Sequence, residues 1–222
     1  MNASGRRGLR YVTPTGPEAD FQPGSRGRVM RNRLGITTKT AMDRVEYESL
    51  IHAQESYVQR VGQETRFTVA ILRDMHRTWL GGLYSWAGEY RSVELQKGAF
   101  RWPPAYLVDQ NMQAFDKGLL CTHTPCREGT VNEVARRLAE VHAELLLIHP
   151  FRDGNGRLAR WLADLMALQA GLPIPAYSFE GRGSEKKRDA YLAAVTHGYA
   201  QNYEPLTAFF AEALVKALEA RA

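Results

Sequence analysis

Cysteine is scarce in this sequence, which holds only Cys121 and Cys126 among its 222 residues. Two cysteines are too few for the disulfide framework that stabilises small secreted domains. Long apolar runs are missing too, since none approaches the roughly 20 residues that a membrane-spanning helix needs. The basic residues at the start are not followed by the apolar stretch of a secretory signal peptide. We therefore expect a cytoplasmic chain that does not associate with a membrane, and delivery into another cell stays open.

Excess charge is missing from most of the chain. Residues 1–34 hold seven arginines and two acidic residues, whereas residues 35–222 hold 22 basic and 22 acidic residues. A basic segment can attract nucleic acid, but the neutral balance of the remainder argues against nucleic acid as the partner. The first 34 residues are also rich in Gly, Pro and Ser, a composition typical of poorly ordered termini. We therefore predict a basic, flexible N-terminal segment over 1–34 and a single domain over 35–222.

Apolar residues recur at steps of three and four along most of the domain, which is the periodicity of an amphipathic helix. The clearest case contains Val131, Val134, Leu138, Val141 and Leu145. Asp43 is the predicted N-cap of the first helix. The predicted helices cover residues 43–61, 68–80, 105–119, 130–148, 155–170, 185–201 and 205–218.

The stretch from Tyr90 to Trp102 has a different pattern. Polar and apolar residues alternate along it, Lys97-Gly98 interrupts it, and Pro103-Pro104 follows it. Alternation on both sides of a short break is typical of a β-hairpin. A hairpin of this size is marginal alone and needs a helix or a partner to pack against. The predicted fold class is therefore all-α with one short hairpin.

Residues 149–160 read His-Pro-Phe-Arg-Asp-Gly-Asn-Gly-Arg-Leu-Ala-Arg and join two of the predicted helices. Pro150 disfavours helical backbone at His149, so the preceding helix should end there. Gly154-Asn155-Gly156 then allows a tight backbone with positive φ, within which the next helix begins. Backbone N–H groups of such a turn and of a helix N-terminus form a ready anion site.

Four side chains of this segment suit phosphate chemistry. Arg157 and Arg160 are three residues apart, so both should project from one face of the first helical turn, and a guanidinium fits phosphate oxygens. Asp153 adds a carboxylate suited to hold Mg2+ against phosphates. His149 carries an imidazole whose ordinary pKa of about 6.5 suits a general base. Each residue alone has an ordinary structural explanation, but eight positions matching at about 1 in 20 each give chance odds on the order of 10^-10.

The segment resembles the motif of the Fic family, His-x-Phe-x-(Asp/Glu)-Gly-Asn-Gly-Arg-x-x-Arg, with all eight specified positions present. Residues 86–91 and 97–100 resemble the family's flap region more weakly. The resemblance implies a Fic-type helical bundle over about residues 43–215, with the hairpin as a flap ahead of the motif. It also implies a nucleotidyltransferase: a protein adenylyltransferase that moves AMP from Mg-ATP to a Ser, Thr or Tyr hydroxyl of a target protein and releases pyrophosphate.

The resemblance assigns a role to each residue of the motif. His149 would take the proton from the target hydroxyl, and Asp153 would hold Mg2+. The loop would stabilise the α-phosphate, and the two arginines would grip the β- and γ-phosphates. The nucleotide-binding residues would then be Gly154, Asn155, Gly156, Arg157 and Arg160. The flap residues that bind the target's backbone as an added strand would be Lys97, Gly98 and Phe100.

Several alternatives stay open from the sequence. Fic-type proteins with altered motifs transfer other groups, and no residue that reads the base is identifiable, so UMP or GMP could replace AMP. A non-catalytic module that binds nucleotide or protein is a second alternative, although such a module has no need of His149. A toxin and a signalling modifier fit the same chemistry. The target, the oligomeric state and the purpose of the basic segment are not encoded in any pattern that we recognise.

Many Fic proteins are silenced by a helix that carries (Ser/Thr)-x-x-x-Glu-(Gly/Asn). Residues 124–129 match these letters but precede the helix over 130–148 in a loop with Pro and Gly, and Glu180-Gly181 fails because Ala176 replaces Ser or Thr. We therefore expect an inhibitor, if one exists, to be a separate small antitoxin. Cys121, His123 and Cys126 supply three metal-ligand side chains without a fourth, which favours free thiols over a zinc site.

Overall fold

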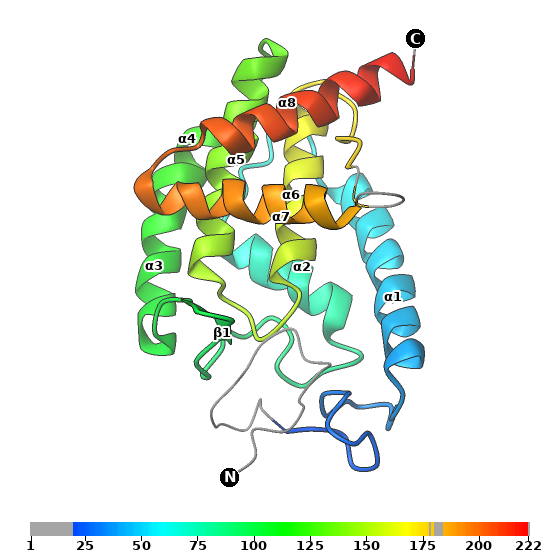
Figure 1. The fold of residues 1–222 in the computed structure, drawn as a ribbon. Helices are drawn as coiled ribbons and strands as arrows, with labels where there is room; N and C mark the ends of the chain where they lie inside the picture. Colours follow the sequence, from blue (N-terminus) through cyan, green and yellow to red (C-terminus); the bar gives the residue numbers. More distant parts are fainter. Residues whose placement is uncertain (1–19, 178, 180–183, 222) are drawn as a thin grey trace.

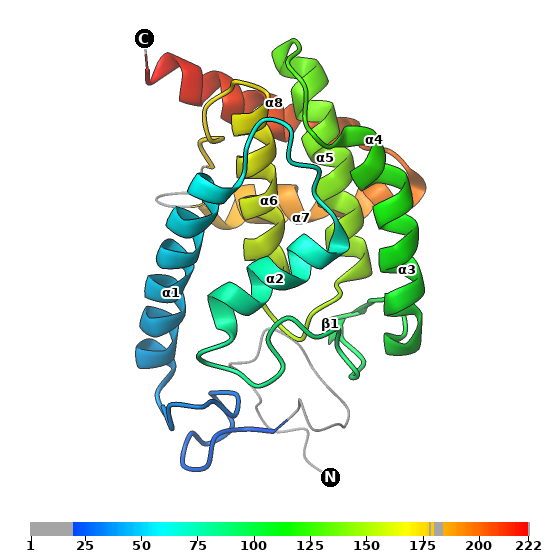
Figure 2. The same ribbon diagram turned by 180° about the vertical axis from the view of Figure 1, so that it is seen from behind.

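The computed structural model describes residues 20–177, 179 and 184–221, and its core consists of helices (Figures 1 and 2). Together with a single pair of short strands in the described ranges, this confirms the all-α class. The helices are α1 (Lys39–Arg60), α2 (Val69–Leu80), α3 (Val108–Phe115), α4 (Cys121–His123), α5 (Val131–Ile148), α6 (Asn155–Gln169), α7 (Ser184–His197) and α8 (Glu204–Glu219).

Helix α5 is the centre of the fold and packs against α6, α8, α3 and α7. Of its predicted apolar positions, Val134, Leu138, Val141 and Leu145 are buried, and Val131 in the first turn is partly buried. Thr130 and Glu133 form a capping box at its start, which satisfies backbone donors that the first turn leaves without partners. Figures 1 and 2 show α8 lying across one end of α5 and α6, with the loop between α5 and α6 at the opposite end.

The first two helices show where local signals predict a boundary and where they do not. The second helix begins within one residue of the predicted start at residue 68, and Thr68 is its N-cap, since its hydroxyl accepts a hydrogen bond from the N–H of Ile71. The expectation that Asp43 caps α1 is wrong, because α1 already begins at Lys39 and Asp43 lies in its second turn. There the Asp43 carboxylate pairs with the Lys39 ammonium at 2.5 Å, an i,i+4 contact within the helix.

The predicted hairpin is present between α2 and α3. Strands β1 (Gln96–Lys97) and β2 (Phe100–Arg101) pair antiparallel, with Gln96 opposite Arg101 and Lys97 opposite Phe100. Gly98 opens the two-residue turn with φ +59°, a conformation that glycine adopts without steric cost. The hairpin is followed by η2 (Ala105–Leu107), after which α3, a π-helical turn η3 (Asp116–Leu120) and α4 form one continuous rod.

Residues 20–36 pack onto the domain ahead of α1. Val29 and Met30 are buried, and an isolated bridge pairs Met30 with Phe21. The Asn32 side chain donates to the carbonyls of Met30 and Ile36 and accepts two backbone N–H groups, which fixes this loop. The expectation of a flexible segment is therefore not met for residues 20–34, while residues 1–19 lie outside the described part. The division of the chain between residues 34 and 35 stays a prediction.

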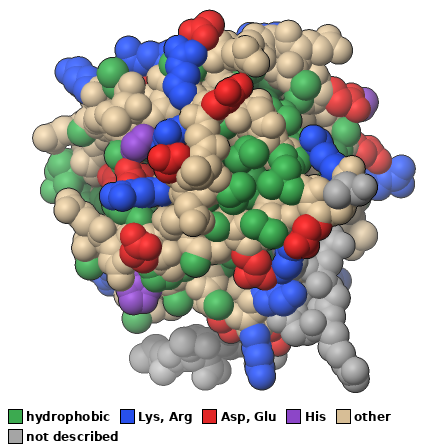
Figure 3. All heavy atoms as spheres, turned by 90° about the horizontal axis from the view of Figure 1, so that it is seen from above, with side chains coloured by type: hydrophobic (Ala, Val, Ile, Leu, Met, Phe, Trp, Pro, Cys, Tyr) green, Lys and Arg blue, Asp and Glu red, His purple; other side chains and the backbone are tan. Residues whose placement is uncertain are grey.

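The end of the molecule that carries α8 presents hydrophobic side chains among charged ones (Figure 3). Val215 and Leu218 of α8, together with Ile174, are among the large hydrophobic residues that stay exposed. Within the described ranges, no helix combines the length and the apolar character that crossing a membrane requires.

Candidate active site at the junction of α5 and α6

The junction between α5 and α6 is built on two left-handed residues. Helix α5 ends at His149, which has φ +53° and ψ 60°, and α6 starts after Gly154, which has φ +84°. A Cβ atom at Gly154 would lie 2.8 Å from the Trp79 ring, so only glycine fits there. Gly156 differs, because it lies inside α6 without positive φ and a Cβ there would meet only Arg160 Nη1, at 3.8 Å.

Asn155 closes the loop from inside. Its side chain is fully buried, accepts the N–H of Phe151 at 2.9 Å and donates to the carbonyl of Phe151 at 2.8 Å. Both ends of the amide are therefore engaged by backbone, so the side chain of Asn155 shapes the loop rather than facing a ligand. The amino end of α6 lies at the same place, and its first N–H groups favour an anion.

His149 is 4% exposed, and its ring is oriented by backbone oxygen. Its Nδ1 lies 3.0 Å from the carbonyl of Leu146, which can only accept, so Nδ1 is the donor. In the neutral ring the basic nitrogen is then Nε2. Trp102 packs on the imidazole with ring centroids 4.1 Å apart, and its indole N–H donates to the same carbonyl at 2.9 Å.

Arg91 fixes the backbone of this half of the junction. It is buried, and its guanidinium donates to the carbonyls of His149 at 2.8 Å, Val93 at 2.9 Å and Pro103 at 2.6 Å. Its own N–H donates to the carbonyl of Pro150 at 2.8 Å. Arg91 thus ties the entry and exit of the hairpin to the end of α5. Sequence reasoning gave Arg91 no such role, since the only signal was the weak family resemblance over residues 86–91.

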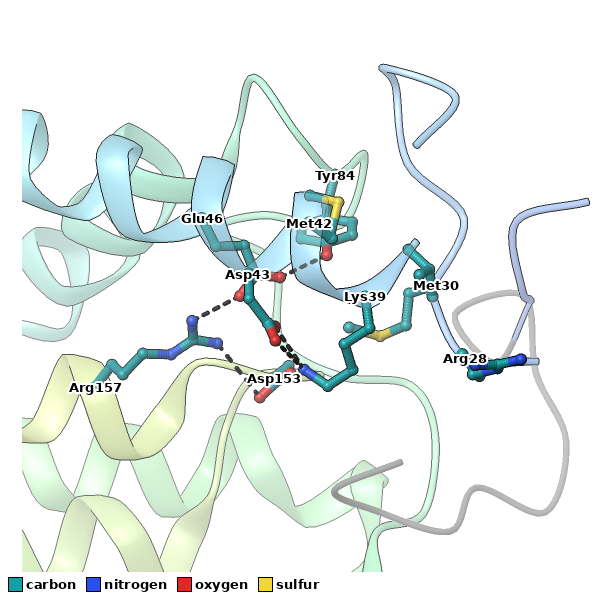
Figure 4. Close-up of a pocket in the computed structure, with 10 residues that line it drawn as sticks. Arg28, Met30, Lys39, Met42, Asp43, Glu46, Tyr84, Asp153 and Arg157 are labelled. Carbon is teal, nitrogen blue, oxygen red and sulfur yellow. Dashed lines mark hydrogen bonds and ion pairs between the residues drawn. The ribbon is translucent and has the colours of Figure 1, made fainter. Parts of the chain in front are cut away.

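The other half of the junction is held by charged side chains (Figure 4). Arg157 donates to Glu46 of α1 at 2.6 Å, lies 3.9 Å from Asp153, and stacks over Trp79 with its guanidinium carbon 4.5 Å from the ring centroid. Glu46 also accepts the Tyr84 hydroxyl at 2.6 Å. Burial lowers the pKa of Arg157, but the Asp153 and Glu46 carboxylates outweigh it, so the pKa lies above its ordinary value.

Glu46, Asp153 and Arg157 line a pocket of about 360 Å³ between α1 and the loop that precedes α6. Asp153 and Arg157 contribute one wall, α1 contributes a second, and the segment over 28–30 contributes a third (Figure 4). The Asp153 carboxylate is 17% exposed and accepts the N–H of Gly154 at 2.6 Å. Charges of both signs therefore face a cavity large enough for part of a nucleotide.

His76 supports the loop from beneath and was not expected to take part. Its Nε2 donates to the carbonyl of Asp153 at 3.0 Å, its Nδ1 accepts the N–H of Gly88 at 2.8 Å, and its ring stacks on Phe151 at 4.0 Å. Burial lowers the pKa of His76 to about 4, so this histidine is neutral near pH 7. Its position on an apolar face of α2 carried no signal beyond packing.

The two arginines of the motif contact different neighbours. Arg157 faces Glu46 and Trp79, whereas Arg160 lies over Gly156 and within 5.6 Å of the Phe179 ring. The expected projection from one face is thus only approximate in this state, and the roles of both side chains stay predictions.

The hairpin reaches the junction through aromatic contacts. Phe100 packs on Trp102 with centroids 5.0 Å apart and on Tyr199 at 5.4 Å, while Lys97 and Gly98 are exposed at the tip. Because Trp102 also packs on His149, the flap and the candidate base form one connected unit.

The remaining candidates from the sequence lie away from the junction. Nε2 of His123 pairs with Glu140 at 2.7 Å, and the described part of the chain contains no group of three or more His, Cys, Asp or Glu residues that could hold a metal ion. Glu128 lies beside Gly171, just past the end of α6, and the 11 residues back to Arg160 span about 16 Å of helix, so Glu128 does not reach Arg160. Glu180 and Gly181 lie outside the described residues.

Comparison with known proteins identifies the family that the motif and fold suggest. Residues 66–167 match the model of the Fic/DOC family. This match covers just under half of the chain, and these residues are similar to a Fic/DOC domain. This domain contains the hairpin, α5 and most of α6, whereas α1 precedes the matched residues.

Two curated relatives and one solved structure illustrate the similarity. Protein adenylyltransferase VbhT of Bartonella schoenbuchensis is 27% identical over 165 residues, which are 74% of this chain and 33% of VbhT. The chain thus spans about a third of the length of VbhT. Probable protein adenylyltransferase Fic of Salmonella typhimurium is 28% identical over 192 residues, covering 86% of this chain and 90% of that protein. The N-terminal FIC domain of Bep8 from Bartonella sp. 1-1C shares the fold, with a TM-score of 0.69 and 17% identity over 84% of this chain and 91% of that one.

Proposed function

We propose that this Fic/DOC protein is a protein adenylyltransferase, which transfers AMP from ATP to a Ser, Thr or Tyr hydroxyl of a target protein and releases pyrophosphate. The observation that carries the proposal is the complete motif at the junction, where Nε2 of His149 is the basic nitrogen and the amino end of α6 lies beside Asp153 and Arg157. The relatives named as adenylyltransferases support the same activity.

His149 acts as the general base. Its Nε2 takes the proton of the target hydroxyl as that oxygen attacks the α-phosphorus, and the bond from this phosphorus to the pyrophosphate oxygen breaks. The carbonyl of Leu146 keeps the proton of the neutral ring on Nδ1, and Trp102 limits the rotation of the ring. A base within reach and correctly oriented contributes about 10^2–10^4-fold in rate.

The phosphates of ATP lie at the amino end of α6. The loop N–H groups over residues 154–156 stabilise the α-phosphate, where negative charge grows during the transfer. Arg157 and Arg160 bind the β- and γ-phosphates, which pair well with planar guanidinium groups. Arg160 turns from Phe179 toward the ligand, whereas Arg157 already faces the pocket beside Asp153.

The donor set at Asp153 fits Mg2+. This ion is usually held by one or two carboxylates together with phosphate oxygens and water, so a cluster of protein ligands is not required. The Asp153 carboxylate is partly exposed toward the pocket, on the side of the loop where the phosphates are proposed to lie. When bound there, Mg2+ would neutralise phosphate charge and orient the leaving group.

The flap presents the target. Each strand of a two-stranded hairpin has one edge without a partner strand, and an extended peptide can pair with such an edge. Lys97, Gly98 and Phe100 form this flap, and the contact of Trp102 with His149 sets its distance from the base. A cytoplasmic site of action, a toxin-like or signalling effect and a separate small antitoxin belong to the same proposal.

The test is a labelling experiment with the whole chain. We incubate the wild type and His149→Asn with cell lysate and ATP labelled at the α-phosphate, then repeat with γ-labelled ATP and with α-labelled UTP and GTP. Asparagine is chosen because it tolerates the left-handed backbone of position 149. Protein label that requires both α-labelled ATP and His149 is the expected result.

The other results separate the alternatives. Label from UTP or GTP would change the nucleotide but keep the mechanism. Label from the γ position only, or equal labelling by His149→Asn, would contradict the mechanism. Nucleotide binding without any labelled protein would favour a non-catalytic binding module.

A further inference from the structure

Arg157 is enclosed on three sides, and one of its neighbours lies outside the family motif. Trp79 covers one face of its guanidinium, Glu46 accepts a hydrogen bond at 2.6 Å, and Asp153 lies at 3.9 Å. The Arg157 side chain is only 21% exposed. A guanidinium that is mostly removed from water needs a carboxylate partner. Whether Glu46 or Asp153 is that partner determines the position of the Arg157 guanidinium.

The Glu46 side chain is fixed by several hydrogen bonds, so it stays the main partner of Arg157. Its side chain is 8% exposed, one carboxylate oxygen accepts the Tyr84 hydroxyl at 2.6 Å, and the other accepts Arg157. Its backbone carbonyl accepts the indole N–H of Trp79 at 2.9 Å, so the same residue fixes the ring on which Arg157 stacks. Because both carboxylate oxygens are engaged in a buried place, Glu46 acts as a fixed support rather than a mobile gate.

We propose that Glu46 is a positioning residue, which holds the Arg157 guanidinium away from Asp153 so that Asp153 binds Mg2+ and Arg157 binds nucleotide phosphate. Asp153 precedes α6, and Arg157 lies in its first turn, so the loop at Gly154 brings the two charges within 3.9 Å. Without the Glu46 carboxylate, Asp153 is the carboxylate already within ion-pair distance of Arg157. A close Arg157–Asp153 pair would then remove the negative charge that the ion needs and the positive charge that the phosphates need.

This proposal rests on the proposed function. Its first test is a structure determination, whose outcome does not depend on whether the chain transfers AMP. In a crystal structure of Glu46→Gln, a nitrogen of Arg157 should lie within about 3 Å of the Asp153 carboxylate, the length of a charge-assisted hydrogen bond. An Arg157 that keeps its place on Trp79 at the present distance from Asp153 overturns the proposal, whether or not the chain transfers AMP.

The second measurement is equilibrium binding of ATP by calorimetry, with and without Mg2+, in the His149→Asn background where transfer is blocked. Mg2+ should strengthen ATP binding, and Glu46→Gln should reduce this gain about tenfold or more, as loss of a group that orients a metal ligand does. Glu48→Gln is the matched control, because Glu48 lies on the same helix but is exposed and pairs with Arg44. The control should retain the full gain.

Other outcomes are assigned as follows. If Glu46→Gln binds ATP more tightly with and without Mg2+, Glu46 competes with phosphate and the proposal is overturned. If Glu46→Gln does not fold, Glu46→Asp takes its place, since it keeps the charge and shortens the reach. That variant should show a smaller loss of the Mg2+ gain than Glu46→Gln would, and an unchanged gain overturns the proposal. Labelled transfer that fails while the Mg2+ gain still depends on Glu46 contradicts the proposed function alone.

Discussion

Different kinds of partner hold the two halves of the α5–α6 junction. On the His149 half, carbonyl oxygens do the orienting: the ring donates to Leu146, and the His149 carbonyl accepts Arg91. On the Arg157 half, opposite charges do so, through Glu46 and Asp153. Hydrogen bonds to neutral carbonyls change little when a charged ligand binds nearby. Ion pairs are weakened or strengthened when a phosphate or a cation binds beside them.

The two halves also differ in where their supports lie along the chain. Arg91, Leu146 and Trp102 all fall within residues 66–167, which match the family model, but Glu46 precedes them on α1. These three supports of the His149 half therefore lie within the region that matches the family model. The half proposed to bind phosphate depends on a helix outside the matched region, and the two halves should fail differently when perturbed.

The largest effect should come from the His149 half. His149→Asn removes the general base, so labelled transfer should fall by about 10^2–10^4-fold. Binding of ATP should change little, because His149 is not among the groups proposed to bind phosphate. The rate of transfer and the calorimetric affinity for ATP, measured on the same protein, check this. A parallel loss of ATP affinity would show that the two halves are not separable.

Loss of the Arg91 guanidinium should be the strongest structural perturbation of the same half. Arg91→Met strips a donor from two buried carbonyls and one partly buried carbonyl, and we expect the free energy of unfolding to fall by about 3–5 kcal/mol. Urea denaturation measures it. Arg101→Met is the matched control on the exposed hairpin, where the Arg101 side chain donates to the Gln96 side chain, and it should change stability by no more than about 0.5 kcal/mol.

Substitutions of Gly154 and Gly156 should distinguish two roles on the Arg157 half: keeping the loop conformation and leaving room for phosphate. Gly154→Ala combines φ +84° with a contact of 2.8 Å to Trp79, so it should cost about 2–4 kcal/mol in unfolding free energy. Gly156→Ala meets neither obstacle and should leave stability unchanged or slightly raised. If Gly156→Ala nevertheless lowers ATP affinity, the glycine is needed for close approach of phosphate, and equal destabilisation by both variants would contradict this reading of the loop.

The smallest effect concerns His76, which touches both halves through Phe151 and the Asp153 carbonyl. Its pKa is about 4 in the folded protein against about 6.5 when unfolded, so the unfolded chain binds more protons between these values. Stability should therefore fall as the pH drops through this window, by about 2 kcal/mol from pH 7 to pH 5. Urea denaturation at both pH values should show a shallower pH dependence for His76→Gln, and an unchanged slope would mean that His76 is not the group responsible.

What the sequence predicted about the fold depended on neighbours close in the chain. Apolar spacing located the helices, Thr68 and Lys97-Gly98 marked a helix start and a turn, and Pro150 marked the end of α5, because each acts within a few residues. The Asp43 cap failed because Asp43 has an alternative local partner in Lys39. The packing of residues 20–34 was missed because the composition of a whole segment does not show which single side chains are buried. Here Val29 and Met30 are buried.

The motif residues of the site were equally visible, but the groups that hold them were not. Glu46 meets Arg157 across 111 positions of sequence, and Arg91 meets His149 across 58. Such pairs form only when distant segments pack together, so local periodicity and spacing in the sequence do not predict them. For Asn155 the motif was visible but the contacts of the side chain were not. Its amide hydrogen-bonds the N–H and the carbonyl of Phe151.

The most direct test of the central claim is the chemical identity of the group transferred. Tandem mass spectrometry of proteins incubated with the wild type and Mg-ATP should find AMP on a Ser, Thr or Tyr hydroxyl, absent after incubation with His149→Asn. Phosphate alone on the hydroxyl, or the same AMP adduct in both samples, would contradict the account.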